Sequence, residues 1–210
     1  MNNKDNRGAF IAFEGIDGSG KSTQSALLIQ KLRQEGIPCY ATMEPTDALI
    51  GSLIRQVMTG RIKTDNKAVA ALFAADRLDH LLNEVDGIVS KIESGVTVVT
   101  DRYYFSSYAY NSVHMPMEWV IKANEQSSAI LRPSLTVYID IDPDTALDRI
   151  AKNRFRQELF EKKSMLVKVR DNYMKAFKLL EKEEKVVIVD GNRPQEEIAE
   201  AVWNAAREYF

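Results

Sequence analysis

The 210-residue sequence has one cysteine, Cys39, only two histidines and no long apolar run. A single cysteine excludes an intramolecular disulfide and is typical of a protein from a reducing compartment. No stretch approaches the about 20 apolar residues that a helix needs to cross a bilayer. The polar start, residues 1–7, also lacks the apolar core of a signal peptide. We therefore expect a cytoplasmic protein that has no membrane partner.

A strong charge of either sign is absent as well. The sequence has 28 Lys and Arg residues against 30 Asp and Glu residues, and its formal net charge is −2. A protein without a basic field has no general attraction for a nucleic acid polymer. No repeat, low-complexity tract or linker divides the chain, so we expect a single domain over residues 1–210.

Five short runs rich in β-branched residues predict buried strands, and the longer segments between them have helical spacing. Strands that alternate with helices indicate an α/β fold, with a five-stranded parallel sheet and helices on both faces. Ligands of such sheets bind at the carboxyl ends of the strands. The predicted strands are 9–13, 39–43, 96–100, 135–141 and 185–189, and one predicted helix, 25–32, is followed by Gly36.

The segment after the first predicted strand has the pattern of a phosphate-binding loop, G-x-x-x-x-G-K-[ST]. It reads Gly15-Ile16-Asp17-Gly18-Ser19-Gly20-Lys21-Ser22. The backbone N–H groups of such a loop bind the phosphates of a nucleoside triphosphate, and the following helix points its positive end at the same anion. We expect Lys21 to reach the terminal phosphates and the Ser22 hydroxyl to hold Mg²⁺.

A second group of residues concerns the acceptor of the phosphate. Asp101 and Arg102 follow the third predicted strand, where a carboxylate can hold a metal-bound water and a guanidinium can bind a phosphate. Phe73 and Arg77 are four residues apart, on one face of a predicted helix. An aromatic ring and a planar donor can stack on a base and hydrogen-bond it. These residues indicate a nucleotide acceptor.

With these residues the chain resembles the thymidylate kinase (dTMP kinase) family of P-loop nucleoside monophosphate kinases, from Phe10 to about Val202. The resemblance implies the three-layer P-loop NTPase fold and phosphorylation of dTMP to dTDP by ATP with Mg²⁺, in a homodimer. The motifs that carry it are the phosphate loop at 13–24, the base-binding helix at 72–77, the D-R-Y-x-x-S-x-x-A-Y stretch at 101–110, the strand and helix at 133–149, and the end of a flap at 158–161.

The same resemblance implies roles for single residues. Phe73 stacks on thymine, Arg77 contacts a carbonyl of that base, and Arg102 binds the monophosphate. Asp101 orders Mg²⁺ through water, and Lys21 acts on the transferred phosphoryl group. Further implied contacts are those of Asp17 with the 3′-hydroxyl, Tyr103 against the 2′ position, and Ser107 and Tyr110 in the base and sugar pocket. Glu44 is a further substrate-binding candidate, and Gly15 to Thr23, Asn192 and Arg193 are expected to contact ATP.

The chain departs from the family pattern at three places. Many members carry Arg where this chain has Gly18, so we expect a flap over about 149–162 to supply that charge, with Arg154 as first choice and Arg149 or Arg156 as alternatives. The exit of the second strand, 43–46, lacks the usual Arg, so one acceptor-phosphate contact is missing or comes from elsewhere. Asn111 stands where Gln is common, which leaves one base contact open.

Two other functions remain compatible with the sequence. A deoxynucleoside kinase needs a base to deprotonate its acceptor hydroxyl, and Glu44 is a candidate for that base. A nucleotide-dependent switch would use the P-loop but would leave Phe73, Arg77, Arg102 and Tyr103 without a common purpose. In a monophosphate kinase the acceptor oxygen is already ionised, so no general base is required, and His80 and His114 are expected on a helix surface and in a loop.

Overall fold

The computed structural model describes residues 7–153 and 163–210, and its centre is a five-stranded sheet. The strand order is β2-β3-β1-β4-β5, and each neighbouring pair is parallel. This sheet confirms the predicted fold class, and every strand boundary lies within one residue of its prediction. The strands are β1 (Phe10–Glu14), β2 (Cys39–Met43), β3 (Thr97–Asp101), β4 (Leu135–Asp140) and β5 (Val186–Asp190).

The side chains of β1 alternate between the two faces of the sheet. Ile11 and Phe13 belong to one buried cluster and Phe10 and Ala12 to the other, and all four are at most 1% exposed. A strand covered on both sides is apolar on both faces and does not alternate with polar residues, which explains the continuous runs in the sequence. The prediction of burial is wrong for β2 and β5, which lie at the edges of the sheet and are largely half-exposed or exposed.

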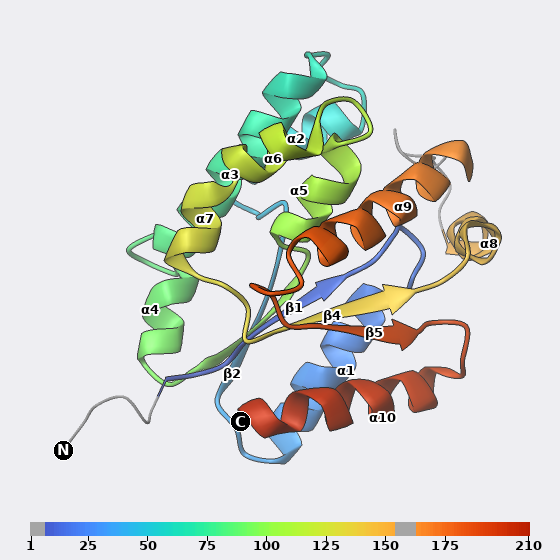
Figure 1. Ribbon diagram of the computed structural model, residues 1–210. Helices are drawn as coiled ribbons and strands as arrows, with labels where there is room; N and C mark the ends of the chain where they lie inside the picture. Colours follow the sequence, from blue (N-terminus) through green and yellow to red (C-terminus); the bar gives the residue numbers. More distant parts are fainter. Residues whose placement is uncertain (1–6, 154–162) are drawn as a thin grey trace.

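Helices α1 (Lys21–Gln34) and α10 (Gln195–Ala206) cover one face of the sheet. Figure 1 shows them side by side below the strands, where Leu28, Leu32 and Val202 enter the core. α1 contains the predicted helix 25–32 and ends before Gly36, as expected. The N-terminus of α1 lies directly after the loop that follows β1.

The other face carries α3 (Asn66–Leu82), α4 (Ile88–Glu93), α5 (Tyr104–Asn111) and α9 (Lys163–Leu179). α5 packs against α9 through Phe105 and Phe177, whose ring centroids are 4.9 Å apart. In the described part of the chain, no helix combines the length and apolar character needed to cross a membrane. The remaining elements are α2 (Leu49–Met58), α6 (Met117–Ala123), α7 (Glu125–Ile130), α8 (Pro143–Asn153) and the short η1 (Arg207–Tyr209).

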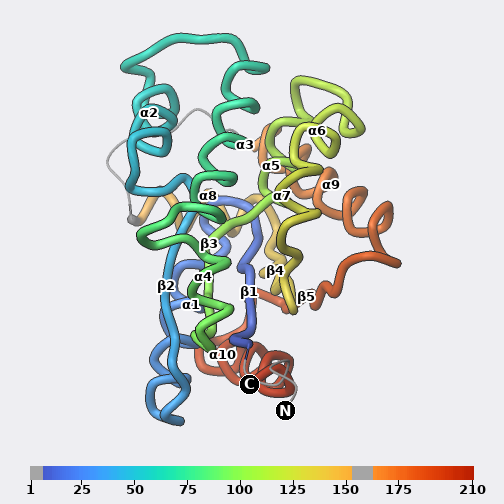
Figure 2. The backbone as a smooth tube through the Cα atoms, turned by 90° about the vertical axis from the view of Figure 1, so that its left-hand side faces the viewer, coloured from blue at the N-terminus to red at the C-terminus, as the bar shows by residue number. Residues whose placement is uncertain are grey.

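Polar residues follow the strands at one edge of the sheet. The loop after β1 leads into α1, Glu44 follows β2, and Arg102 follows β3. Because the strands are parallel, their carboxyl ends meet at the same edge, which is where ligands of such sheets bind. α2 and α3 pack against each other beside this edge (Figure 2). The fold therefore gathers the predicted site residues from elements that are distant in sequence.

Candidate active site

A cavity of about 360 Å³ lies at the carboxyl ends of the central strands. The loop after β1, the β2–α2 connection, α3 and α5 all contribute to its walls. Ten of the residues predicted for the site line it, so the structure brings most of them together. These are Asp17, Lys21, Ser22, Glu44, Phe73, Arg77, Asp101, Arg102, Ser107 and Tyr110.

The loop after β1 has the geometry of an anion site. Gly20 caps α1 with φ 92, a left-handed conformation that glycine adopts without strain. The Lys21 ammonium donates to the Ile16 carbonyl at 3.4 Å and lies 3.8 Å from the Asp17 carboxylate. Burial lowers the pKa of Lys21 from its usual value. A bound phosphate would give this buried ammonium a stronger partner than either contact.

Gly18 packs directly against α8. A Cβ atom at this position would lie 2.5 Å from the Ala146 carbonyl oxygen, and φ is 80. The packing explains why this position holds glycine here. Arg149 of α8 donates to the Ser19 carbonyl at 3.4 Å and to the Gly191 carbonyl at 2.9 Å. Arg154 and Arg156, the other two candidates for the flap cation, lie outside the described residues.

Ser22 and Asp101 form the part of the site that fits a divalent cation. The Ser22 hydroxyl donates to Oδ2 of Asp101, while Oδ1 of Asp101 is buried without a hydrogen-bond partner. Magnesium prefers oxygen ligands and keeps several waters. Across 7–153 and 163–210 no group of three or more His, Cys, Asp and Glu side chains is placed to hold a metal. These two residues therefore suit an ion whose remaining ligands are water and phosphate oxygens.

Arg102 points its guanidinium into the same region. It forms an ion pair with Asp17, donates to Ser106 Oγ at 3.0 Å, and its Cζ lies 5.0 Å from the centre of the Tyr110 ring. Burial disfavours the charged form, but the neighbouring Tyr110 and Asp17 outweigh burial, so the pKa of Arg102 is raised well above its usual value. Arg102 is thus a permanent cation that can exchange Asp17 for a phosphate.

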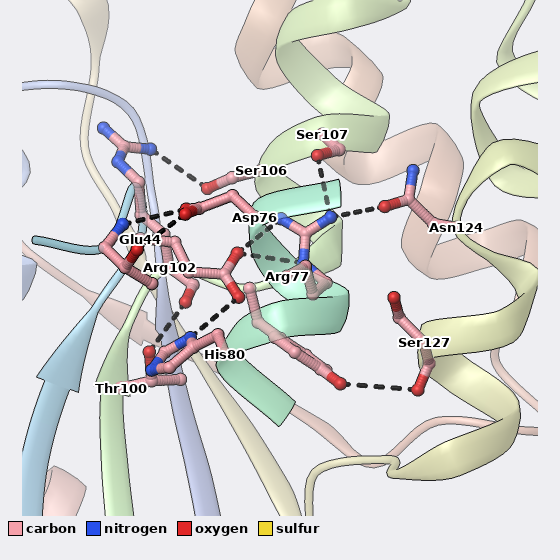
Figure 3. A network of polar contacts seen from close by, with 12 residues as sticks. Glu44, Asp76, Arg77, His80, Thr100, Arg102, Ser106, Ser107, Asn124 and Ser127 are labelled. Carbon is pink, nitrogen blue, oxygen red and sulfur yellow. Dashed lines mark hydrogen bonds and ion pairs between the residues drawn. The ribbon is translucent and has the colours of Figure 1, made fainter. Parts of the chain in front are cut away.

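Arg77 is held by a buried polar network that Figure 3 shows from close by. Its Nε donates to Oε2 of Glu44 at 2.9 Å, and its NH1 donates to Ser107 Oγ at 3.1 Å and to Asn124 Oδ1. The side chains of Arg77 and Glu44 are 1% and 2% exposed. Burial disfavours the charge of Arg77, but Glu44 more than offsets this and raises its pKa. The guanidinium is therefore fixed at the cavity wall in one orientation.

His80 also belongs to this network, and its position differs from the one predicted. The sequence placed it on a helix surface, but it is buried, with Nδ1 3.3 Å from Oε1 of Glu44 and Nε2 2.6 Å from Oγ1 of Thr42. Both oxygens of Glu44 are thus engaged, one by Arg77 and one by His80. Glu44 acts as a support for Arg77, which does not favour the role of a free base for a nucleoside hydroxyl.

The cavity combines apolar and polar walls. Phe73, which is half-buried on α3, and Met58 of α2 both line the cavity. Asn111 of α5 is buried, and its Nδ2 has no hydrogen-bond partner. A buried amide donor without a partner is costly unless a ligand pairs with it. Asn111 is therefore suited to donate to a carbonyl of a bound base.

Tyr103 lies elsewhere than expected. Its side chain is 1% exposed, its hydroxyl donates to the Leu131 carbonyl at 2.9 Å, and its ring lies 5.4 Å from Cζ of Arg77. It is not among the residues that line the cavity. The expectation that Tyr103 contacts the sugar is not met, because the backbone turn at Arg102 directs this ring into the core beneath Arg77.

Arg55 is a cavity residue that the sequence reasoning missed. It lies on α2, donates to the Pro45 carbonyl at 3.1 Å, and its NH2 is 3.3 Å from the Asp47 carboxylate. The sequence did give one indication of such a residue. The usual Arg is missing at the exit of β2, so one phosphate contact had to come from elsewhere in the chain. A cation eleven positions after Glu44 supplies a guanidinium to the same wall.

Three residues expected beside ATP, Thr23, Asn192 and Arg193, do not line the cavity. Thr23 is exposed on the first turn of α1. Asn192 and Arg193 are exposed after β5, where the Asn192 N–H donates to Asp190 at 3.0 Å and Arg193 pairs with the same carboxylate at 3.5 Å. Arg149 donates to the carbonyls of both Gly191 and Ser19, so the chain that leaves β5 lies close to the phosphate-binding loop.

Comparison with known proteins agrees with this geometry. The sequence profile of the family described as thymidylate kinase matches residues 13–202. A probable thymidylate kinase of Methanocaldococcus jannaschii is 38% identical over 181 residues, which cover 86% of each chain. A thymidylate kinase of Geobacillus thermodenitrificans is 38% identical over 198 residues, or 91% of this chain and 86% of the other. A probable thymidylate kinase of Methanosphaera stadtmanae is 34% identical over 96% of this chain and 98% of its own length.

Proposed function

Because this chain belongs to the thymidylate kinase family and phosphorylates dTMP to dTDP with ATP, we propose that the cavity is its dTMP site and the phosphate-binding loop its ATP site. The observation that carries this assignment is the arrangement of three cations around one cavity, two of them buried and Arg102 half-buried. Lys21 comes from the loop after β1, Arg77 from α3 and Arg102 from the end of β3. Cations from three elements suit the phosphates of two nucleotides and a base carbonyl.

In the acceptor site, Arg102 binds the monophosphate and Arg77 the base. Binding of the phosphate frees the Asp17 carboxylate from Arg102, so that it can accept a hydrogen bond from the 3′-hydroxyl. Phe73 stacks on thymine, and Asn111 donates to the base. Ser107 and Tyr110, which hold Arg77 and Arg102 in place, line the base and sugar pocket.

In the donor site, residues Gly15 to Thr23 surround the phosphates of ATP. Backbone N–H groups of the loop and the positive end of α1 bind the β- and γ-phosphates, and Lys21 contacts the transferred group. Ser22 and Asp101 hold Mg²⁺, which when bound neutralises the phosphate charge. Asn192 and Arg193 lie beside the adenine.

The protein accelerates the reaction by positioning the two nucleotides and by neutralising the charge of their phosphates. The acceptor is a phosphate oxygen that is ionised at neutral pH, so no side chain has to remove a proton. A cation from the predicted flap, 149–162, replaces the arginine that Gly18 excludes, with Arg154 as first choice. An arginine in this role is worth on the order of 10³–10⁵ in rate, so Arg154→Ala is expected to lower kcat much more than it raises KM.

We also propose that the protein is a homodimer. The contact would use the segments 73–82 and 119–130, where apolar side chains remain exposed: Leu82 at the end of α3 is 56% exposed, Trp119 of α6 43% and Ile130 of α7 37%. α3 contacts both α6 and α7, so these residues belong to neighbouring elements. Light scattering coupled to gel filtration is expected to give twice the chain mass, and Trp119→Glu to give the monomer.

The function is tested by following ADP formation from ATP and Mg²⁺ with dTMP, dUMP, dCMP, dGMP, thymidine or no acceptor. We expect a rate with dTMP that exceeds those with thymidine, dCMP and dGMP by at least about 100-fold, since a site built for a base carbonyl and a phosphate discriminates strongly against their absence. A preference for thymidine would instead assign a nucleoside kinase. ADP formation that does not depend on any acceptor would assign a nucleotide switch.

A further inference from the structure

Arg102 has an unusual backbone conformation. Its φ is 75, and no other non-glycine residue among those that the structure describes has a positive φ. A left-handed conformation is unfavourable for a residue with a long side chain and persists only where the surroundings hold it. Such strain is often found where a side chain must be aimed at a ligand. The contacts that hold Arg102 therefore decide where its guanidinium points.

Two of these contacts are made by the Arg102 backbone itself. Its N–H donates to the Phe13 carbonyl of β1 at 2.8 Å, and its carbonyl accepts from Oγ1 of Thr100 at 2.9 Å. Thr100 is fully buried on β3, two residues before Arg102, and Figure 3 shows its hydroxyl turned toward Arg102. These bonds fix the peptide groups on both sides of the left-handed residue.

The third contact comes from Glu14, the last residue of β1. Its carboxylate is fully buried, and Oε1 accepts from the backbone N–H groups of Tyr103 at 2.9 Å and Ser106 at 3.1 Å. These groups belong to the start of α5, whose cap residue Tyr103 makes no side-chain cap of its own. A carboxylate from another strand thus takes the place of a local N-cap.

Glu14 is also connected to the guanidinium of Arg102. Its Oε2 accepts from Ser106 Oγ and from the Tyr173 hydroxyl at 2.8 Å. The same Ser106 Oγ accepts from NH1 of Arg102 at 3.0 Å. One buried carboxylate therefore fixes the chain that follows the left-handed turn and, through Ser106, one branch of the Arg102 side chain.

We propose that Glu14 is a positioning residue for dTMP binding, which holds the left-handed turn at Arg102 so that the guanidinium faces the acceptor phosphate. The proposal rests on the proposed role of Arg102. Glu14 touches neither nucleotide, because its carboxylate is covered by Tyr103, Ser106 and Tyr173. A change at Glu14 is therefore expected to weaken the binding of the acceptor and not that of ATP. A general loss of packing at the sheet would also weaken the ATP site beside β1.

The test measures kcat and the KM values for dTMP and for ATP in Glu14→Gln and Thr100→Val. Gln has the shape of Glu but replaces a charge and one acceptor oxygen, and Val has the shape of Thr without its hydroxyl. Both variants are expected to raise KM for dTMP on the order of tenfold, the effect of one lost hydrogen bond, which is charge-assisted at Glu14 and neutral at Thr100, with KM for ATP unchanged. A melting curve for each variant establishes that it is folded.

Thr136→Val is the matched control for Thr100→Val. Thr136 is fully buried on β4, and its Oγ1 has no hydrogen-bond partner. The same change of side chain there removes no contact to the turn, so both KM values are expected to stay at those of the unchanged protein. A rise in KM for dTMP in this control equal to that in Thr100→Val would overturn the specific role of the Thr100 bond.

Arg102→Lys separates the proposal from the function on which it rests. Lys keeps the charge but loses the planar fork that binds a phosphate through two bonds. If Arg102→Lys leaves KM for dTMP unchanged, the role of Arg102 itself is wrong. If it raises KM for dTMP while Glu14→Gln and Thr100→Val do not, only the positioning role is overturned. The double variant Glu14→Gln, Arg102→Lys is expected to be less impaired than the product of the single effects, because both act on one contact.

Should Glu14→Gln fail to fold, Thr100→Val carries the test alone, since it changes one neutral hydrogen bond. Equal increases in both KM values, for dTMP and for ATP, in Thr100→Val would also contradict the proposal. They would mean that the turn supports the sheet edge in general and not the acceptor site.

Discussion

Arg77 donates from both Nε and NH2 to the same oxygen of Glu44, and both side chains are almost completely buried. The other oxygen of Glu44 lies 3.3 Å from Nδ1 of His80. A buried ion pair of this kind adds little stability by itself, but removal of one partner leaves a charge uncompensated. The pair therefore serves to hold the guanidinium at the cavity wall.

Glu44→Gln is expected to lower the free energy of unfolding by about 3 kcal/mol, because Arg77 then keeps a buried charge without a carboxylate. Urea unfolding followed by fluorescence measures the loss. Glu183→Gln is the control, since Glu183 pairs with Arg132 at 2.7 Å on the surface, and such pairs contribute less than about 1 kcal/mol. Equal losses in the two variants would contradict the view that the Arg77 network depends on Glu44.

Gly18→Ala is expected to destabilise the protein through both backbone strain and contact with α8. Gly60 offers a matched control: its φ is 74, but a Cβ atom there would meet nothing within 4 Å. Gly60→Ala should therefore lose about 1 kcal/mol from strain alone, and Gly18→Ala about 1–3 kcal/mol more from the clash with Ala146. Thermal unfolding of both variants measures the two losses of stability. Similar losses would show that contact with α8 does not exclude a side chain at position 18.

The strands, the loop that follows β1 and the Asp101–Arg102 pair that follows β3 could be predicted from the sequence. Each of them is a contiguous segment whose residues form a recognisable pattern. β1 is apolar from Phe10 to Phe13 since it is covered on both faces, and the loop from Gly15 to Ser22 has the fixed spacing of a phosphate-binding pattern. Exposure of β2 and β5 could not be predicted in this way, because the position of a strand within a sheet depends on pairings between distant segments.

The supports of the site were also beyond the reach of local patterns. His80 is buried because α3 packs beside β2, which brings Thr42 and Glu44 to its ring. Arg55 reaches the cavity because α2 folds back on the chain that follows Glu44. Tyr103 turns into the core because Arg102 before it is left-handed. Each of these placements follows from tertiary contacts that spacing in the sequence does not record.

The stability of the protein is expected to depend on pH through Glu14. Burial raises the pKa of this carboxyl above its ordinary value of 4.5, although Ser106 and Arg102 oppose the shift. Since the folded state then holds the proton more tightly than the unfolded chain, the stability from this proton is complete below about pH 4.5 and is lost as the pH rises through the folded-state pKa.

Glu14→Gln has no carboxyl group at this position. A comparison with this variant therefore isolates the effect of the Glu14 titration on stability. The free energy of unfolding of the unchanged protein minus that of Glu14→Gln is expected to fall as the pH is raised from 4.5 toward neutrality. Urea unfolding at several pH values measures this difference. A difference that is constant, or that grows with pH, would mean that the folded protein holds the carboxylate without a raised pKa.

Asp101→Asn is expected to weaken the response to magnesium. Asn keeps the size of the side chain but removes the charge and the free carboxylate oxygen, so the Mg²⁺ concentration that gives half-maximal activity should rise about tenfold. Asp144→Asn is the control, since Asp144 is exposed on α8 and pairs with Lys163. If the two variants respond to Mg²⁺ alike, Asp101 does not take part in holding the ion.

The central claim, that dTMP binds in the cavity between Phe73, Arg77 and Arg102, is tested most directly by a crystal structure of the protein with dTMP. The account predicts the phosphate on the Arg102 guanidinium in place of the Asp17 carboxylate, and the thymine ring on Phe73 with a carbonyl toward Arg77. A nucleotide whose phosphate lies away from Arg102, or whose base lies outside the cavity, would contradict it.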